Sequence, residues 1–177
     1  MATLIGAIDQ GTTSTRFILY RIQEGGDGGG DVARLTPVAS HQMEHTQIYP
    51  RAGWCEHDPE EIMANTLTCI DRALAAVPGG GATASDVRCV GITNQRETTV
   101  AWDRGSGKPL HNAVVWMDMR TAQLCDDLAA QFGGDKDHFR ATCGLPISTY
   151  FSAMKMKWLL DNSPEVAAAA AGGGGGG

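Results

Sequence analysis

The sequence lacks several features that would assign it to a common class of protein. No apolar run reaches the ~18 residues of a membrane span, and the first residues have neither the basic region nor the apolar core of a secretory signal. The five cysteines are widely spaced and form no Cys-x-x-Cys pair, so neither a disulfide framework nor a zinc site is indicated. We therefore expect no membrane partner and a reducing compartment, with the cytoplasm as the first choice.

Basic residues are also few. The 14 lysines and arginines are outnumbered by 20 aspartates and glutamates, which gives a formal net charge of −6 and no basic cluster. Because a nucleic-acid surface needs such a cluster, we expect no nucleic-acid partner. Aromatic residues make up only 6% of the chain, but hydrophobic residues make up 42%, which is typical of a globular domain.

Strand and helix patterns alternate along the chain. Apolar runs at 4–8 and 17–20 predict two strands, and the segment between them is too short for a crossover helix, so we expect an antiparallel hairpin. Further strands are predicted at 33–41, 87–93, 98–102 and 113–115. Helices are predicted at 58–77, 121–132 and 152–162. The interleaving indicates an α/β fold with a mixed sheet and flanking helices.

The helix at 58–77 has the clearest start. Asp58 suits the N-cap, Pro59 the first helical position, and Glu60 and Glu61 the positive end of the helix dipole. Helical spacing predicts its buried face as Ile62, Met63, Leu67, Ile70, Leu74 and Val77. On the last helix Met154, Trp158 and Leu159 should point inward, and Trp54 and Trp102 are also expected in the core.

Two segments have a composition that favours no packed core. Five glycines and Asp27 at 25–30 predict a flexible loop, and 167–177 is an alanine run followed by six glycines. We interpret 1–166 as the folded domain and 167–177 as a low-complexity tail.

The polar segment 9–16, Asp-Gln-Gly-Thr-Thr-Ser-Thr-Arg, has the groups that a phosphate site needs. Gly11 allows close backbone approach, Arg16 offers a planar fork, and Asp9 at the strand end suits Mg²⁺. Thr12, Thr13, Ser14 and Thr15 offer four hydroxyls and their backbone N–H groups to phosphate oxygens, and the candidate catalytic groups are Asp9 and Arg16. The segment matches neither a Walker loop nor a dinucleotide fingerprint. An ordinary polar turn remains the alternative.

A second polar segment carries a family resemblance. Gly91-Ile-Thr-Asn-Gln-Arg-Glu-Thr98 resembles the stretch that holds the triol in glycerol kinases, and together with 9–16 it resembles the glycerol kinase branch of the FGGY carbohydrate kinases. Similar stretches lie at 45–58, 115–121, 144–146 and 150–158, so the likeness covers about residues 5–162. The segment Ser-Thr-Tyr-Phe at 148–151 is most similar to trypanosomatid glycerol kinases.

The resemblance implies an incomplete ribonuclease-H-like domain of the actin, hexokinase and heat-shock ATPase type. It implies ATP-dependent phosphorylation of glycerol, with ATP and Mg²⁺ bound, and a cleft that both polar segments line. Carried over by position, the glycerol contacts are Arg96, Glu97, Trp116 and Tyr150. The resemblance likewise assigns Thr12, Thr13, Ser14 and Arg16 to the ATP phosphates and Asp9 to the Mg²⁺. It also implies a homo-oligomer, and a glycosome as the alternative compartment. The family's general base lies in a Gly-Asp-Gln segment that these 177 residues do not contain, so we expect this chain alone to be inactive.

Several alternatives stay open. Arg96 and Glu97 could form an exposed ion pair. Trp116 and Tyr150 could be ordinary core residues. Asp118 and Arg120 are expected to form a structural ion pair. The chain could also come from a pentulose kinase of the same family, or from a polyol- or nucleotide-binding module without catalysis.

Overall fold

A computed structural model describes residues 3–23 and 34–172. The chain divides into two compact units: Met1–Thr46 with Glu60–Gln95, called the first unit, and Gln47–Pro59 with Arg96–Gly177, called the second unit. The predicted glycine loop at 25–30 lies outside the described residues. Within the described ranges, no helix has both the length and the apolar composition that crossing a bilayer requires.

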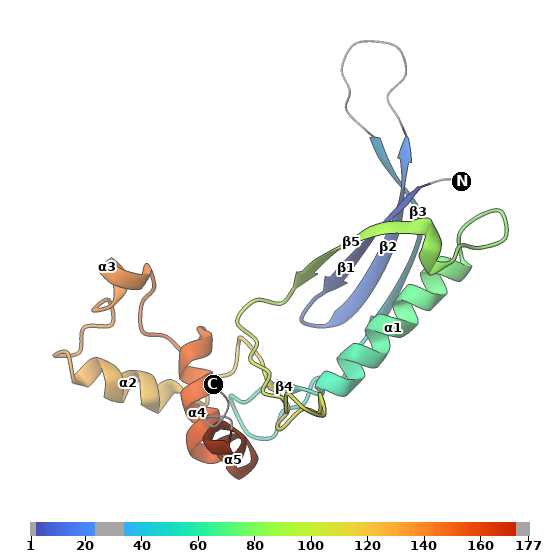
Figure 1. The fold of residues 1–177 in the computed structure, drawn as a ribbon. Coiled ribbons are helices and arrows are strands. Elements are labelled where there is room, and N and C mark those ends of the chain that lie inside the picture. Colours follow the sequence, from blue (N-terminus) through green and yellow to red (C-terminus); the bar gives the residue numbers. More distant parts are fainter. Residues whose placement is uncertain (1–2, 24–33, 173–177) are drawn as a thin grey trace. The chain divides into compact units, whose positions relative to one another are not determined.

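A mixed sheet forms the first unit. Its strands are β1 (Leu4–Gln10), β2 (Ser14–Gln23), β3 (Arg34–Glu44) and β5 (Val87–Asn94), in the order β3-β2-β1-β5 (Figure 1). β2 runs antiparallel to both neighbours and β5 runs parallel to β1. The predicted hairpin is confirmed, but its loop is shorter than expected because β2 already begins at Ser14. Asp9 and Arg16 are therefore paired across the two strands.

Helix α1 (Pro59–Ala75) packs against this sheet, and a short 3₁₀ turn, η1 (Ala84–Asp86), precedes β5. The core between helix and sheet consists of Leu4, Phe17, Leu19, Cys69, Ala73 and Val77. The predicted helix is confirmed, but its predicted inward face is wrong in part, since Met63 and Leu67 are exposed. The face that meets the sheet is centred on Cys69 and Ala73, and Cys69 Sγ donates to the carbonyl of Thr15 at 3.4 Å, so Met63 and Leu67 lie outside the contact.

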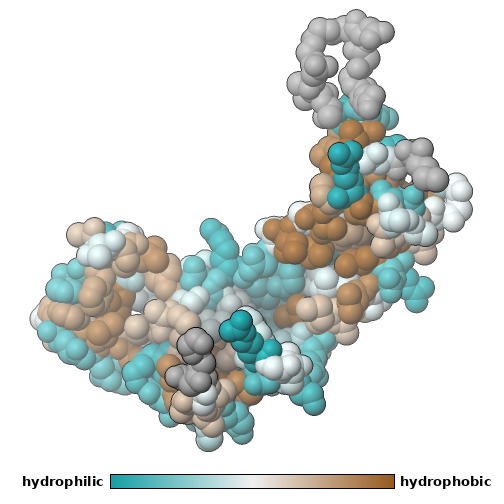
Figure 2. All heavy atoms as spheres, viewed as in Figure 1, coloured by the Kyte–Doolittle hydropathy of each residue, from teal (hydrophilic) through white to brown (hydrophobic). Residues whose placement is uncertain are grey.

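The sheet of the first unit also has an exposed apolar area. Val90 and Ile92 on β5 are exposed although both are hydrophobic. Figure 2 shows hydrophobic colouring over this sheet. Among the described strands, β5 pairs with β1 alone and is an edge of the sheet.

The second unit contains little sheet. β4 (Glu56–His57) pairs antiparallel with β6 (Ala113–Val114). The strand predicted at 98–102 is wrong, because that segment forms only isolated bridges at Thr99 and Trp102. Trp102 was expected in the core but is 61% exposed.

Four helices complete the described part of the second unit: α2 (Ala122–Ala130), α3 (Arg140–Cys143), α4 (Ser152–Asn162) and α5 (Pro164–Gly172). α2 and α4 confirm two predicted helices. α3 and α5 were not expected, and α5 takes in the alanine run because Val166 packs into a core cluster with Val114 and Leu159. A second cluster joins Cys125, Ala129 and Ile147.

Candidate functional site

The turn between β1 and β2 is very tight. The backbone N–H of Gly11 donates to the carbonyl of Ser14 at 2.9 Å. A Cβ at position 11 would lie 3.3 Å from that carbonyl oxygen, closer than most Cβ contacts. Glycine therefore allows the turn to close, and the hydroxyls of Thr12, Thr13 and Ser14 follow one another around it.

Hydrogen bonds from neighbouring elements fix this turn. The Nε2–H of His45 donates to the carbonyl of Thr12 at 2.8 Å, and the backbone N–H of His45 donates to that of Thr13 at 3.2 Å. Gln95, just after β5, donates its backbone N–H to the carbonyl of Gln10 at 2.7 Å and its side-chain amide to the Gln10 side chain at 3.2 Å. The turn is thus anchored on both sides, which suits a preorganised anion site.

Arg16 is exposed, and its guanidinium is held by β3. Its Nε and Nη2 donate to Gln42 Oε1 at 2.9 and 2.6 Å, and the amide nitrogen of Gln42 donates to Ser14 Oγ at 2.9 Å. Gln42 was not identified from the sequence, although it is the cross-strand neighbour of Arg16. This chain of contacts keeps the cation close to the hydroxyl-rich turn.

Asp9 is the one predicted metal ligand. Its side chain is exposed at the end of β1. No group of three or more His, Cys, Asp or Glu side chains that could hold a metal occurs within residues 3–23 and 34–172. A lone carboxylate fits an ion such as Mg²⁺, which takes one or two protein carboxylates together with water and substrate phosphates.

The predicted glycerol contacts lie in the second unit, and Glu97 has the most unusual backbone among them. It is the one non-glycine residue with a positive φ, 65°, in the described ranges. Its Oε2 accepts hydrogen bonds from the backbone N–H of Ser152 at 3.1 Å and from Ser152 Oγ at 3.0 Å, at the start of α4. Arg96 is exposed, and an Arg96–Glu97 ion pair is not among those that the described residues form.

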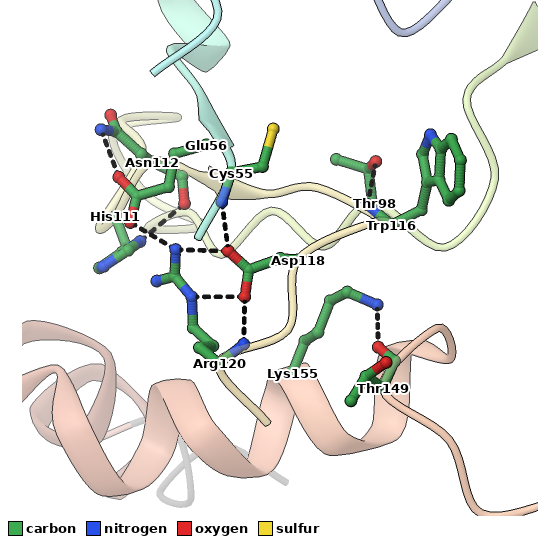
Figure 3. Close-up of polar contacts among 10 residues, drawn as sticks. All are labelled: Cys55, Glu56, Thr98, His111, Asn112, Trp116, Asp118, Arg120, Thr149 and Lys155. Carbon is green, nitrogen blue, oxygen red and sulfur yellow. Dashed lines mark hydrogen bonds and ion pairs between the residues drawn. The ribbon is translucent and has the colours of Figure 1, made fainter. Parts of the chain in front are cut away.

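Trp116 and Tyr150 come together although 34 positions separate them. Their ring centroids lie 5.8 Å apart at an interplanar angle of 62°, and both side chains are half-buried. The backbone N–H of Trp116 donates to Thr98 Oγ1 at 3.2 Å (Figure 3). Thr98 is the residue after Glu97, and Ser152, which binds the Glu97 carboxylate, lies two positions after Tyr150. Glu97, Trp116 and Tyr150 therefore share one region of this unit.

A buried ionic cluster supports the segment that carries Trp116 (Figure 3). Arg120 donates through Nη2 to Glu56 at 2.7 Å and to Asp118 at 2.9 Å, and its Nε also donates to Asp118 at 2.9 Å. Its guanidinium stacks on the rings of Trp54 and Trp158, 4.0 and 4.7 Å from their centroids. The predicted structural ion pair between Asp118 and Arg120 is confirmed.

The arrangement of the first unit defines the class of protein. A three-stranded antiparallel meander, a helix, and then a strand parallel to the first make the opening of a ribonuclease-H-like domain, the fold of actin and hexokinase. Residues 4–173 match the N-terminal domain of the FGGY family of carbohydrate kinases. The chain belongs to this family, which confirms the predicted fold and family.

Several known proteins with similar sequence are glycerol kinases. The chain is 51% identical to a glycerol kinase of Arabidopsis thaliana over 163 residues, which are 92% of this chain and 29% of that protein. It is 51% identical to a glycerol kinase of Chloroflexus aggregans over 165 residues, 93% of this chain and 30% of that protein. The chain therefore spans less than a third of these relatives.

Two solved structures extend this comparison. A Plasmodium falciparum glycerol kinase crystallised with ADP matches with a TM-score of 0.83 at 35% identity, over 97% of this chain and 31% of that one. A xylulose kinase of Rhodospirillum rubrum matches with a TM-score of 0.74 at 25% identity, over 94% of this chain and 30% of that one. The similarity to trypanosomatid enzymes stays a prediction.

Proposed function

We propose that this chain is the N-terminal part of a glycerol kinase, which transfers the γ-phosphoryl group of ATP to a terminal hydroxyl of glycerol and yields sn-glycerol 3-phosphate. The observation that carries the proposal is the difference in identity between the two kinds of relative. Among solved structures, identity is 35% to the glycerol kinase of Plasmodium falciparum but 25% to a xylulose kinase with the same fold, and it is 51% to glycerol kinases of a plant and a bacterium.

The nucleotide half of the proposed site is the turn between β1 and β2. Backbone N–H groups and the hydroxyls of Thr12, Thr13 and Ser14 would meet phosphate oxygens, and Arg16 would neutralise their charge. The contact of Arg16 with Gln42 supports this role because it holds the guanidinium beside Ser14. Asp9 would hold Mg²⁺ jointly with the nucleotide. A bound Mg²⁺ would offset charge on the transferring phosphoryl group.

The polyol half is the region around Glu97. Because Ser152 occupies Oε2, the Oε1 of Glu97 is the oxygen that would accept a glycerol hydroxyl. Arg96 would donate to a second hydroxyl oxygen. The Trp116 ring would pack against the carbon chain, and the Tyr150 hydroxyl would complete the polar contacts. That this half and the nucleotide half line one cleft stays a prediction.

The first experiment uses the complete kinase that contains this domain. Glycerol and xylulose are compared as phosphate acceptors, and we expect glycerol to be preferred. Glu97→Ala and Arg96→Ala should lower kcat/KM for glycerol by about 10²-fold, that is ~2.7 kcal/mol, while the KM for ATP is kept. Glu165→Ala on α5 is the matched control. Preference for xylulose, or unchanged glycerol kinetics in both site variants, would contradict the assignment.

We further propose that 1–166 is an incomplete kinase domain and that the 177 residues alone do not catalyse transfer. The sequence contains no Gly-Asp-Gln segment to accept the hydroxyl proton. Phosphoryl transfer also depends on precise positioning of donor and acceptor. Glycerol-dependent ATP turnover by the isolated chain, abolished by Glu97→Ala, would refute this proposal.

The remaining expectations concern assembly and location. We propose a homo-oligomeric kinase that acts in the cytoplasm, with a glycosome-like organelle as the alternative. All five cysteines are free, which supports a reducing compartment. Light scattering of the complete enzyme and fluorescence microscopy of a tagged copy test these two points.

A further inference from the structure

Lys155 on α4 is a fully buried cation, with a relative exposure of 0%. Its Nζ donates to the backbone carbonyl of Thr149 at 2.9 Å and to that of Tyr150 at 2.5 Å. Figure 3 shows the side chain reaching along the start of α4 to Thr149. Ion pairs formed by residues 3–23 and 34–172 do not include Lys155.

Packing alone does not account for a lysine at this position. Removing an ammonium from water is unfavourable, and an apolar side chain of similar volume would fill the same space without that penalty. Burial lowers the pKa of Lys155, whereas the nearby carboxylates of Glu97 and Asp118 act in the opposite direction. The burial of an ammonium here indicates that it stabilises specific acceptors, and its two hydrogen bonds show that these are the carbonyls of Thr149 and Tyr150.

The two acceptors are adjacent peptide groups, which one side chain can serve only if it carries several donors. Lysine has three N–H donors on one flexible stem and can reach both carbonyls at once. The second of these carbonyls belongs to Tyr150, whose ring lies 5.8 Å from that of Trp116. A further contact within the same segment runs from the backbone N–H of Tyr150 to Ser148 Oγ at 3.2 Å.

We propose that Lys155 is a positioning residue of the polyol site, which fixes the backbone of Thr149 and Tyr150 and so places the Tyr150 side chain against Trp116. The inference rests on the proposed function, because Tyr150 is one of the proposed glycerol contacts. Lys155 itself does not touch the substrate in this arrangement. Without it, two carbonyls lose their donor, and the segment before α4 is free to turn toward other partners.

The test measures steady-state kinetics of the complete kinase for Lys155→Met, Tyr150→Phe and the double variant. Lys155→Met should raise the KM for glycerol about tenfold, equivalent to ~1.4 kcal/mol, with the KM for ATP within about twofold of wild type. In the Tyr150→Phe background, Lys155→Met should raise the KM for glycerol less than about threefold, since the hydroxyl that Lys155 helps to place is gone. Lys157→Met is the matched control, because Lys157 lies on the same helix but is 58% exposed and pairs with Asp161.

The outcomes separate this inference from the proposed function. An unchanged glycerol KM in folded Lys155→Met, or an equal rise in both Tyr150 backgrounds, would overturn the positioning role. So would a parallel rise in the KM for ATP, which is the mark of a general structural defect. If Lys155→Met does not fold, Lys155→Arg, which keeps the cation but moves its donors, carries the same measurements. Absence of glycerol phosphorylation by the wild-type enzyme would instead contradict the proposed function.

Discussion

Replacing Glu97 by alanine and by glycine would separate the role of its backbone from that of its side chain. Both variants lose the carboxylate and with it the two hydrogen bonds to Ser152. They differ in a single methyl group at a residue whose φ is 65°, in the left-handed region that glycine adopts readily and other residues adopt rarely. The difference in stability between the two variants therefore reports the backbone conformation.

The difference in the free energy of unfolding between Glu97→Gly and Glu97→Ala follows from two opposing contributions. A Cβ in the left-handed region costs roughly 1–2 kcal/mol. Glycine in turn loses more backbone entropy on folding, which costs roughly 0.5–1 kcal/mol relative to alanine. Glu97→Gly should therefore be more stable than Glu97→Ala by about 0.5–1 kcal/mol. At a slope of ~2 kcal/mol per M this is a difference of about 0.4 M in the midpoint of urea unfolding.

Tryptophan fluorescence is the natural assay, because all four tryptophans belong to the second unit, which also contains Glu97. Met156, exposed in the middle of α4, gives the matched control, since glycine there should be less stable than alanine by about 1 kcal/mol. If alanine proved more stable than glycine at position 97 as well, the left-handed backbone would be refuted. Both Glu97 variants should have the same high KM for glycerol in the complete kinase.

Three further predictions concern stability. Gly6→Ala should destabilise the first unit by about 1–3 kcal/mol in circular dichroism melts, because the new Cβ would lie 2.6 Å from the Phe17 ring. The control is Gly91→Ala on β5, where a Cβ meets nothing within 4 Å, so the melt should change little. Arg120→Met should cost about 3–5 kcal/mol by tryptophan fluorescence, because it leaves buried carboxylates without their cation, and a loss below 1 kcal/mol would contradict the buried pairing. Burial raises the pKa of the Cys69 thiol above its ordinary 9.0, so the thiol of the unfolded chain loses its proton at a lower pH than that of the folded chain. The free energy of unfolding should therefore fall as the pH rises past 9.0. Cys69→Ala should weaken that fall in urea titrations at pH 8 to 11.

Local signals in the sequence predicted the elements whose structure depends on local chemistry. The hairpin of β1 and β2 follows from two apolar runs with a short polar segment between them. The start of α1 follows from Pro59 with Glu60 and Glu61 behind it, and it is found where expected. These predictions were accurate because turn residues and helix starts are set by neighbours in the chain.

Predictions about burial were less accurate, because burial depends on partners that are distant in sequence. Trp102 is exposed although its residue type favours the core. Lys155 was not considered as a core residue, yet it lies four positions before the buried Leu159 and so on the same helical face. The i, i+4 spacing to Leu159 indicates burial, whereas the residue type of lysine favours exposure, and here the periodicity prevails. Gln42 shows the same limit, since its contact with Arg16 depends on the register of β2 and β3.

The start of α4 links the parts of the proposed polyol site. Ser152 holds the carboxylate of Glu97, 55 positions earlier, and Lys155 holds the carbonyl of Tyr150. Neither Ser152 nor Lys155 is a proposed glycerol contact, but each binds a residue that is. Because both belong to one helix, a shift of α4 would displace Glu97 and Tyr150 together. Leu159 on the same helix is buried in a core cluster with Val114 and holds α4 in place. A substitution in that cluster should accordingly weaken glycerol binding without any contact to the substrate.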